Sequence, residues 1–239
     1  MSLRGFLLLI RVPCVGCLGL AVKNSLMKTN PKYIVFDGMD GSGKGTQMKL
    51  LRETFGDSVV FTREPGGTPF AEEIRTLALD NPLAGKSTSL NNFFLFMAAR
   101  EELQQNLVVP ALRSGKHVFS DRGDSSTYAF QLHGEEHEEF LDVFTCTREL
   151  VFSERNGRRQ PDRYIVFDLP ADVARERAVR DPRRVQNRFD LRDLHYYERV
   201  QTGFRKFAQR YPVVFVDATQ SPEDVHRSVK EILAKEFAA

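Results

Sequence analysis

Cysteine is scarce in this sequence, which has only three in 239 residues. Three cysteines cannot build a disulfide framework, because one always stays unpaired. Cys14 and Cys17 form a C-x-x-C, but no second cysteine pair or histidine cluster completes a zinc site. The chain is therefore predicted to be a reduced, intracellular protein, and we expect a cytoplasmic location.

An excess of charge of either sign is also missing. The formal net charge is only +2, from 34 basic and 32 acidic residues. This balance excludes an overall field that would favour nucleic acid or an anionic membrane. No apolar run is long enough to span a bilayer, because Arg11 and Pro13 separate the segments 6–10 and 15–22. We therefore expect neither nucleic acid nor a membrane among the partners.

Acidic residues are absent before Asp37, so residues 1–36 carry only basic charges. Such a composition suits an organelle-targeting segment, whereas Met27 could equally be the natural start. Both alternatives stay open. No internal repeat or low-complexity linker divides the rest of the chain. We therefore predict an N-terminal extension over residues 1–30 and one domain over residues 31–239.

Strand and helix patterns alternate along this domain. Short apolar runs predict strands at 33–37, 59–62, 116–120, 164–168 and 213–216. Helical spacing predicts helices at 44–55, 69–79, 91–113, 135–154, from 172, at 191–209 and from 222. The alternation predicts an α/β domain of three layers, with a five-stranded parallel sheet flanked by helices. Ligands of such sheets bind at the carboxyl ends of the strands.

The first predicted strand runs directly into a glycine-rich loop that opens a helix. This is the G-x-x-x-x-G-K arrangement in its required context, and it is typical of the P-loop NTPase fold. Glycines let successive backbone N–H groups turn towards a phosphate, and the helix N-terminus adds positive charge. We therefore predict ATP binding by this loop, which consists of Gly38, Met39, Asp40, Gly41, Ser42, Gly43, Lys44, Gly45 and Thr46.

A magnesium site is expected beside the loop. Gly45 stands where a Ser or Thr usually supplies a hydroxyl ligand, so Thr46 or a water molecule would take that place. Asp37 and Asp121 are carboxylates at predicted strand ends, and carboxylates suit Mg²⁺ or its water shell. The predicted Mg²⁺ site therefore comprises Asp37, Thr46 and Asp121.

Four further motifs accompany the phosphate loop: Phe61-Thr-Arg-Glu-Pro-Gly-Gly-Thr-Pro69, Leu95-Phe-Met-Ala-Ala-Arg100, Asp121-Arg122 with Ser126-Thr-Tyr-Ala-Phe-Gln131, and Asp217-Ala-Thr219. In this order they are highly specific, and the chain from about residue 32 onwards resembles the thymidylate kinase family. The resemblance implies transfer of the γ-phosphoryl group of ATP to deoxythymidine monophosphate (dTMP), which gives dTDP and ADP in dTTP biosynthesis. It further implies ATP and Mg²⁺ as cofactors and a homodimer.

The resemblance also implies roles for two residues of one predicted helix. Phe96 and Arg100 are four residues apart, so they share a helix face. The family's phenylalanine stacks on the thymine ring, and its arginine donates a hydrogen bond to a base carbonyl. Core packing is the alternative for Phe96, because Phe93 and Phe94 stand beside it.

Other motif positions match contacts of the acceptor nucleotide. Arg122 and Arg63 match the arginines that hold its phosphate, with structural salt bridges as the alternative. Asp40 corresponds to the acid that meets the sugar's 3′-hydroxyl. The positions around the base are matched by Arg75, Thr127 and Gln131. Gly123 departs from the family, which most often has a tyrosine beside the sugar there, so the resemblance does not extend to sugar discrimination.

An arginine completes the catalytic set in this family. Some members carry a basic residue in the phosphate loop, whereas bacterial-type members have glycine there and an arginine in a lid; Gly41 places this chain with the second group. Arginines crowd one segment of the chain: Arg175, Arg177, Arg180, Arg183, Arg184, Arg188 and Arg192. A solvated basic helix face is the alternative explanation of this cluster. We predict a lid at about 180–190 that excludes water and supplies Arg188, or else Arg180 or Arg184.

The predicted catalytic residues are thus Lys44, Arg188, Arg122 and Asp40. Three alternative functions stay open: a nucleoside monophosphate kinase with another acceptor, a P-loop ATPase, and a non-catalytic nucleotide-binding module.

Overall fold

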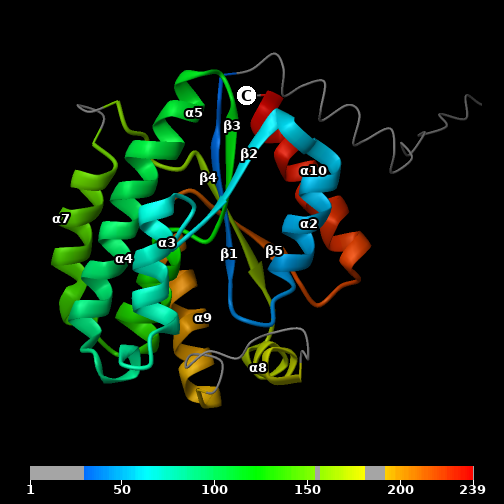
Figure 1. Ribbon diagram of the computed structural model, residues 1–239. Helices are drawn as coiled ribbons and strands as arrows, with labels where there is room; N and C mark the ends of the chain where they lie inside the picture. Colours follow the sequence, from blue (N-terminus) through cyan, green and yellow to red (C-terminus); the bar gives the residue numbers. More distant parts are fainter. Residues whose placement is uncertain (1–29, 154–156, 181–191, 239) are drawn as a thin grey trace, which may run out of the picture.

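The computed structural model describes residues 30–153, 157–180 and 192–238. Within these ranges the strands form one parallel sheet in the order β2-β3-β1-β4-β5, drawn in Figure 1. The strands are β1 (Tyr33–Gly38), β2 (Val59–Arg63), β3 (His117–Asp121), β4 (Arg163–Asp168) and β5 (Val213–Asp217). The predicted α/β class and five-stranded parallel sheet are confirmed.

Helices cover both faces of the sheet and make three layers (Figure 1). One face carries α2 (Lys44–Phe55) and α10 (Pro222–Ala238). The other face carries α3 (Pro69–Arg75), α4 (Ser89–Leu103), α5 (Val109–Arg113) and α7 (Leu141–Val151). Helix α8 (Ala171–Arg180) lies at the carboxyl end of the strands, whereas α9 (Leu194–Ala208) extends to the start of β4, where Phe207 packs against Tyr164.

The position of β1 at the centre of the sheet explains why its sequence is a continuous apolar run. All 6 of its residues are buried, because β3 and β4 flank it and helices cover both faces. Alternate side chains enter different cores: Ile34 and Phe36 pack beneath α2 and α10, whereas Tyr33 and Val35 pack beneath α4, α5 and α7. This burial holds the end of β1, where the glycine-rich loop begins, in a rigid setting.

The register brings three strand ends together. Phe36 of β1 lies opposite Asp121 of β3, and Asp121 lies opposite Arg63 of β2. The residues that follow these three strands therefore meet at one edge of the sheet. This is the edge at which parallel sheets bind ligands.

Two predicted helix starts are confirmed by their caps. The Thr68 hydroxyl accepts a hydrogen bond from the backbone N–H of Ala71 at 3.3 Å, at the start of α3. The Ser221 hydroxyl accepts one from the N–H of Asp224 at 3.2 Å, at the start of α10. Side-chain acceptors at these positions satisfy N–H groups that have no partner within the helix.

One predicted helix, at 135–154, is wrong in its first part. Helix α7 begins only at Leu141, and Glu136 has a φ of 60°, which no α-helix can contain. The helical residues lie earlier instead, in α6 (Asp124–Ser126) and in the π-helix η5 (Thr127–Gly134). Two other π-turns, η2 (Thr76–Asp80) and η4 (Gln104–Val108), extend α3 and α4. No helix of the described ranges is long and apolar enough to cross a membrane.

Candidate active site

The phosphate loop connects β1 to α2 at this edge of the sheet. Gly43 caps α2 with a φ of 81°, a conformation that glycine adopts without strain. The Lys44 ammonium forms an ion pair with the Asp121 carboxylate at the end of β3. Residues 39–46 line a pocket of about 990 Å³, and Gly38 forms the last residue of β1 behind it. The loop thus presents an open, cationic surface to an anionic ligand.

Gly41 approaches α8 so closely that no side chain fits. A Cβ added there would lie 2.0 Å from the Ala174 carbonyl oxygen and 2.9 Å from the Ala178 backbone nitrogen. Its φ of 81° also lies in the left-handed region. A basic side chain at this loop position would therefore require α8 to move.

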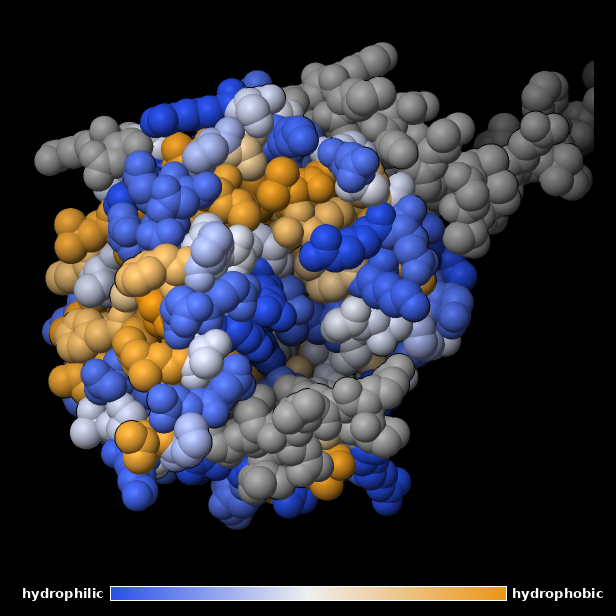
Figure 2. Space-filling model, in the orientation of Figure 1, coloured by the Kyte–Doolittle hydropathy of each residue, from blue (hydrophilic) through white to orange (hydrophobic). Residues whose placement is uncertain are grey.

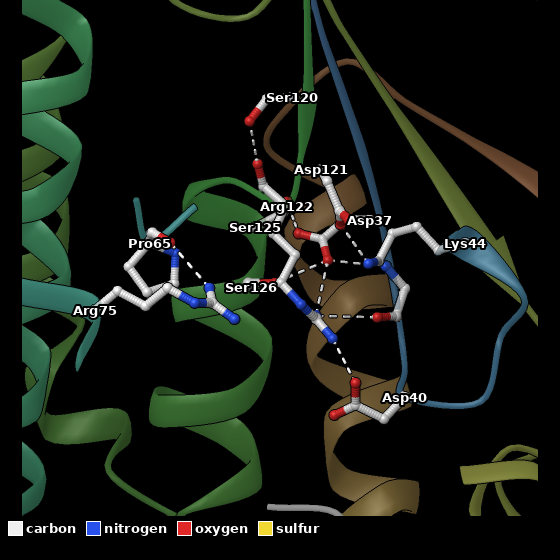
Figure 3. A network of polar contacts seen from close by, with 11 residues as sticks. Asp37, Asp40, Lys44, Pro65, Arg75, Ser120, Asp121, Arg122, Ser125 and Ser126 are labelled. Carbon is white, nitrogen blue, oxygen red and sulfur yellow. Dashed lines mark hydrogen bonds and ion pairs between the residues drawn. The ribbon is translucent and has the colours of Figure 1, made fainter. Parts of the chain in front are cut away.

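Arg122 is the centre of the polar network at the strand ends (Figure 3). It follows β3 with a φ of 72°, which is uncommon for a residue other than glycine. In this conformation its Nη2 donates to the Asp40 carboxylate at 2.6 Å. Its Nη1 lies 3.1 Å from the Ser126 hydroxyl, 3.2 Å from the Gly38 carbonyl and 3.3 Å from the Asp37 carboxylate. The side chain is thereby held against the phosphate loop.

Asp37 anchors this network from within the core. Its carboxylate is completely buried and accepts hydrogen bonds from the hydroxyls of Ser125 at 2.6 Å and Ser126 at 2.8 Å. Burial raises its pKa, although the charge of Arg122 acts in the opposite direction. Both carboxylate oxygens therefore accept from serine hydroxyls, and one of these serines, Ser126, also contacts Arg122.

A second pocket, of about 140 Å³, adjoins the phosphate pocket. Seven of the predicted residues line it: Asp40, Arg75, Phe96, Arg100, Arg122, Thr127 and Gln131. Both Phe96 and Arg100 come from α4, whereas Thr127 and Gln131 come from η5. An aromatic ring and several fixed donors around a small cavity suit a planar, polar ring such as a nucleobase.

The two remaining arginines differ in their partners. Arg63 lies outside the second pocket and pairs with Glu72 at 2.8 Å on the surface. Arg75 lines both pockets and donates to the Pro65 carbonyl at 2.9 Å, with no carboxylate of the described ranges in salt-bridge contact. Burial and the charge of Arg63 lower the pKa of Arg75. An anion bound between the pockets would therefore be stabilised by Arg75 more directly than by Arg63.

The junction of the two pockets is formed by Asp40, Glu64, Arg75 and Arg122, which line both. Hydrophilic residues line the hollow on this face of the molecule (Figure 2). A phosphate at the loop and a second phosphate at this junction would lie side by side. The arrangement therefore suits transfer of a phosphoryl group between two anionic ligands.

The predicted magnesium residues fit a metal only in part. Thr46 is exposed in the phosphate pocket, and Asp121 is there as well. Burial opposes ionisation of Asp121, but the charges of Lys44 and Arg122 hold its pKa below the usual value. Both carboxylate oxygens of Asp37 already accept hydrogen bonds from serine hydroxyls. No cluster of three acidic, histidine or cysteine ligands occurs in the described part of the chain. The donor set therefore suits a metal carried mainly by phosphate oxygens.

Comparison with known proteins identifies the family. Residues 36–229 match the family described as "Thymidylate kinase". The chain belongs to the thymidylate kinase family. Thymidylate kinase from Symbiobacterium thermophilum is 37% identical over 215 residues, which cover 86% of this chain and 95% of that protein. The Kosmotoga olearia thymidylate kinase is 35% identical over 207 residues, or 84% of this chain and 95% of the relative.

A solved structure agrees with the sequence relatives. The crystal structure of thymidylate kinase from Ehrlichia chaffeensis superposes with a TM-score of 0.65 at 29% identity. It covers 85% of this chain and 98% of that one. Membership of the thymidylate kinase family thus rests on both sequence and fold, and it makes the chain an ATP-dependent nucleoside monophosphate kinase.

Three residues of the site were not predicted from the sequence: Glu64, Phe130 and Ser125. Glu64 lines both pockets and pairs with Arg100, although it lies within a quoted family motif. Phe130 lines the second pocket, and its ring centre lies 5.0 Å from the Arg122 guanidinium. Ser125 had no signal in the sequence, because its bond to Asp37 depends on the fold.

Most of the predicted lid, including Arg184 and Arg188, lies outside the described residues. Arg180 ends α8, lines the phosphate pocket and pairs with Glu176 on its own helix. The lack of space at Gly41 leaves no room for a basic side chain at that loop position unless α8 moves. The role of Arg188 stays a prediction.

Proposed function

We propose that this thymidylate kinase family member transfers the γ-phosphoryl group of ATP to dTMP, with ATP at the phosphate loop and dTMP in the second pocket. The observation that carries the proposal is the gathering of Phe96, Arg100 and Thr127 around a small pocket that opens directly onto the phosphate loop. A ring face binds the base, and the arginine selects a carbonyl on its edge.

Phosphoryl transfer requires little covalent participation of the protein. Lys44 and Arg122 would neutralise charge on the two phosphates, and Arg75 would hold the acceptor phosphate at the junction of the pockets. Asp40 would accept from the sugar's 3′-hydroxyl while its other contact keeps Arg122 in place. Arg188 would complete the charge stabilisation from the lid.

Mg²⁺ supplies charge neutralisation between the phosphates of bound ATP. We propose that Asp121 and Thr46 contact the ion or its water shell, and that Asp37 acts only through Arg122. This assignment rests on the exposure of Thr46 in the phosphate pocket and on the internal hydrogen bonds of Asp37.

The test is an assay of ADP release over a panel of nucleoside monophosphates. We expect dTMP to give the highest kcat/KM and cytidine or adenosine monophosphate to react far more slowly. Faster reaction of either of these nucleotides would refute the acceptor assignment. Hydrolysis of ATP without phosphorylation of any nucleotide would refute the transfer reaction itself.

We further propose a homodimer formed through the apolar side chains of α3, α4 and α7. Large apolar side chains are exposed there, with Phe70 at 63% and Leu150 at 70%, and Leu77, Leu83, Leu90 and Phe94 lie on or between the same elements. Hydrophobic residues gather over this side of the molecule at the left of Figure 2. Apolar patches of this kind mark protein interfaces.

Sedimentation of Phe94→Glu tests the dimer. We expect the variant to sediment as a monomer, whereas Phe215→Glu, at an exposed phenylalanine of β5, should remain dimeric. A monomeric unmodified protein would refute the proposal. The cytoplasmic location, and organelle targeting by residues 1–30 as its alternative, stay predictions.

A further inference from the structure

Glu64 lies at the junction of the two pockets, where it is held by three different elements. It directly follows β2, and its backbone N–H donates to the Asp121 carbonyl at 2.9 Å. Its side chain is only 4% exposed. One carboxylate oxygen accepts from the Arg100 Nε at 2.6 Å, and the other accepts from the Tyr33 hydroxyl at 3.4 Å. The carboxylate therefore has one position, set by β1, β2 and α4.

The contacts of Arg100 fix the plane of its guanidinium. Besides the bond from Nε to Glu64, Nη2 donates to the Thr127 hydroxyl at 3.0 Å and Nη1 to the Met97 sulfur at 3.2 Å. Arg100 is 3% exposed, so what remains accessible faces the pocket that it lines. Each terminal nitrogen carries two hydrogens, which leaves one donor on each for a ligand.

Because a guanidinium is planar and rigid, two fixed nitrogens determine where the remaining donors point. Glu64 fixes the nitrogen nearest the side-chain stem, and no other carboxylate of the described ranges pairs with Arg100. The next residue, Pro65, accepts from Arg75 through its carbonyl at 2.9 Å. One dipeptide thus orients two of the arginines in the pocket.

We propose that Glu64 is a positioning residue that sets base selectivity, by aiming the free N–H donors of Arg100 at a base carbonyl. A base with an amino group at the same place would put its own donor against the N–H donors of Arg100, and it would therefore be rejected. This inference rests on the proposed function, because it takes a pyrimidine monophosphate as the occupant of the second pocket.

The experiment compares Glu64→Gln with Glu101→Gln, which removes an ion pair of the same helix α4 outside the pocket. Steady-state constants are measured for dTMP and deoxycytidine monophosphate (dCMP), and folding is followed by circular dichroism. For Glu64→Gln we expect a roughly 10- to 100-fold loss of kcat/KM for dTMP, since misplaced donors cost about that much. Activity with dCMP should fall much less. Glu101→Gln should keep the selectivity of the unmodified protein.

Equal losses with dTMP and dCMP would show a merely structural role and overturn the inference, as would selectivity within about threefold of the unmodified protein. If Glu64→Gln does not fold, Glu64→Asp decides, because it keeps the charge but shortens the reach. It should then lose selectivity, and unchanged selectivity would overturn the inference. Unmodified protein that prefers another acceptor would instead refute the proposed function.

Discussion

Arg122 offers the sharpest test of the site, because its backbone and its side chain can be perturbed separately. The residue has a φ of 72°, and its side chain, 21% exposed, bonds to two acidic groups, a hydroxyl and a carbonyl. We consider three variants: Arg122→Lys, Arg122→Ala and Arg122→Gly. The lysine keeps the charge, the alanine removes the side chain, and the glycine also removes the backbone strain.

The structure assigns a different free-energy cost to each variant. Arg122→Ala leaves the buried Asp37 without its nearest cation, and loss of one partner of a buried pair typically costs about 3–5 kcal/mol of unfolding free energy. Arg122→Gly should be about 1 kcal/mol more stable than Arg122→Ala, because the left-handed conformation penalises a Cβ. Arg122→Lys should lose only about 1–2 kcal/mol, since it keeps the charge and forfeits some hydrogen bonds.

Activity should follow a different order from stability. A lysine cannot bond to Asp40 and grip a phosphate with a second nitrogen at the same time. We therefore expect kcat/KM for dTMP to fall about 100-fold or more in Arg122→Lys, as for other lost phosphate-stabilising donors. Urea unfolding and the ADP-release assay measure the two quantities. Arg163→Lys, whose arginine pairs with Glu236 away from both pockets, is the control and should retain activity.

Two results would refute this reasoning. If Arg122→Lys retains kcat/KM within about tenfold, bidentate contact is unnecessary. If Arg122→Gly is no more stable than Arg122→Ala, the positive φ stores no strain that glycine relieves.

Three further predictions address the extension, the loop and the lid. A protein that starts at Met27 should keep kcat/KM within about tenfold of the full chain, because the family match begins only at residue 36; a larger loss in a folded truncation would contradict this. Gly41→Ala should impair nucleotide binding and activity because its Cβ meets α8, whereas Gly85→Ala, which lies outside both pockets and where nothing lies within 4 Å of an added Cβ, should fold and bind ATP normally; equal effects in a binding titration would rule out the steric argument. Arg188→Ala should lower kcat and kcat/KM together by roughly 10²–10⁴-fold, with little change in ATP binding. A modest rise in KM that added salt weakens would instead indicate general electrostatic attraction.

The phosphate loop and the strands could be predicted because their patterns are local. A buried strand, a glycine-rich turn and a helix start follow one another within a short stretch, so no knowledge of the rest of the fold is needed. The shared helix face of Phe96 and Arg100 is also local, since it depends only on helical spacing. The structure places both side chains at the same pocket.

Glu64 and Ser125 could not be predicted for the opposite reason. Glu64 acquires its role only where α4 crosses the end of β2, and its partner Arg100 lies 36 positions further along the chain. Helix α6 and η5 were missed because serine and threonine at 125–127 are typical of turns, and π-helical hydrogen bonding has no clear sequence pattern. Tertiary contacts with α9, including the close approach of Gly134 to Tyr196 and Val200, stabilise that segment instead.

The contact between Gly41 and α8 also restricts how such an enzyme can change over evolution. A single substitution that introduced an arginine into the loop would clash with the Ala174 carbonyl before the new charge could be useful. If Arg188 is the lid arginine, as predicted, its earlier loss would leave an enzyme without either group. Exchange between the two arrangements therefore requires α8 to be repositioned by other mutations beforehand, so the two types should form separate lineages with few intermediates. Ancestral substitutions in α8 would be the ones that permit the change.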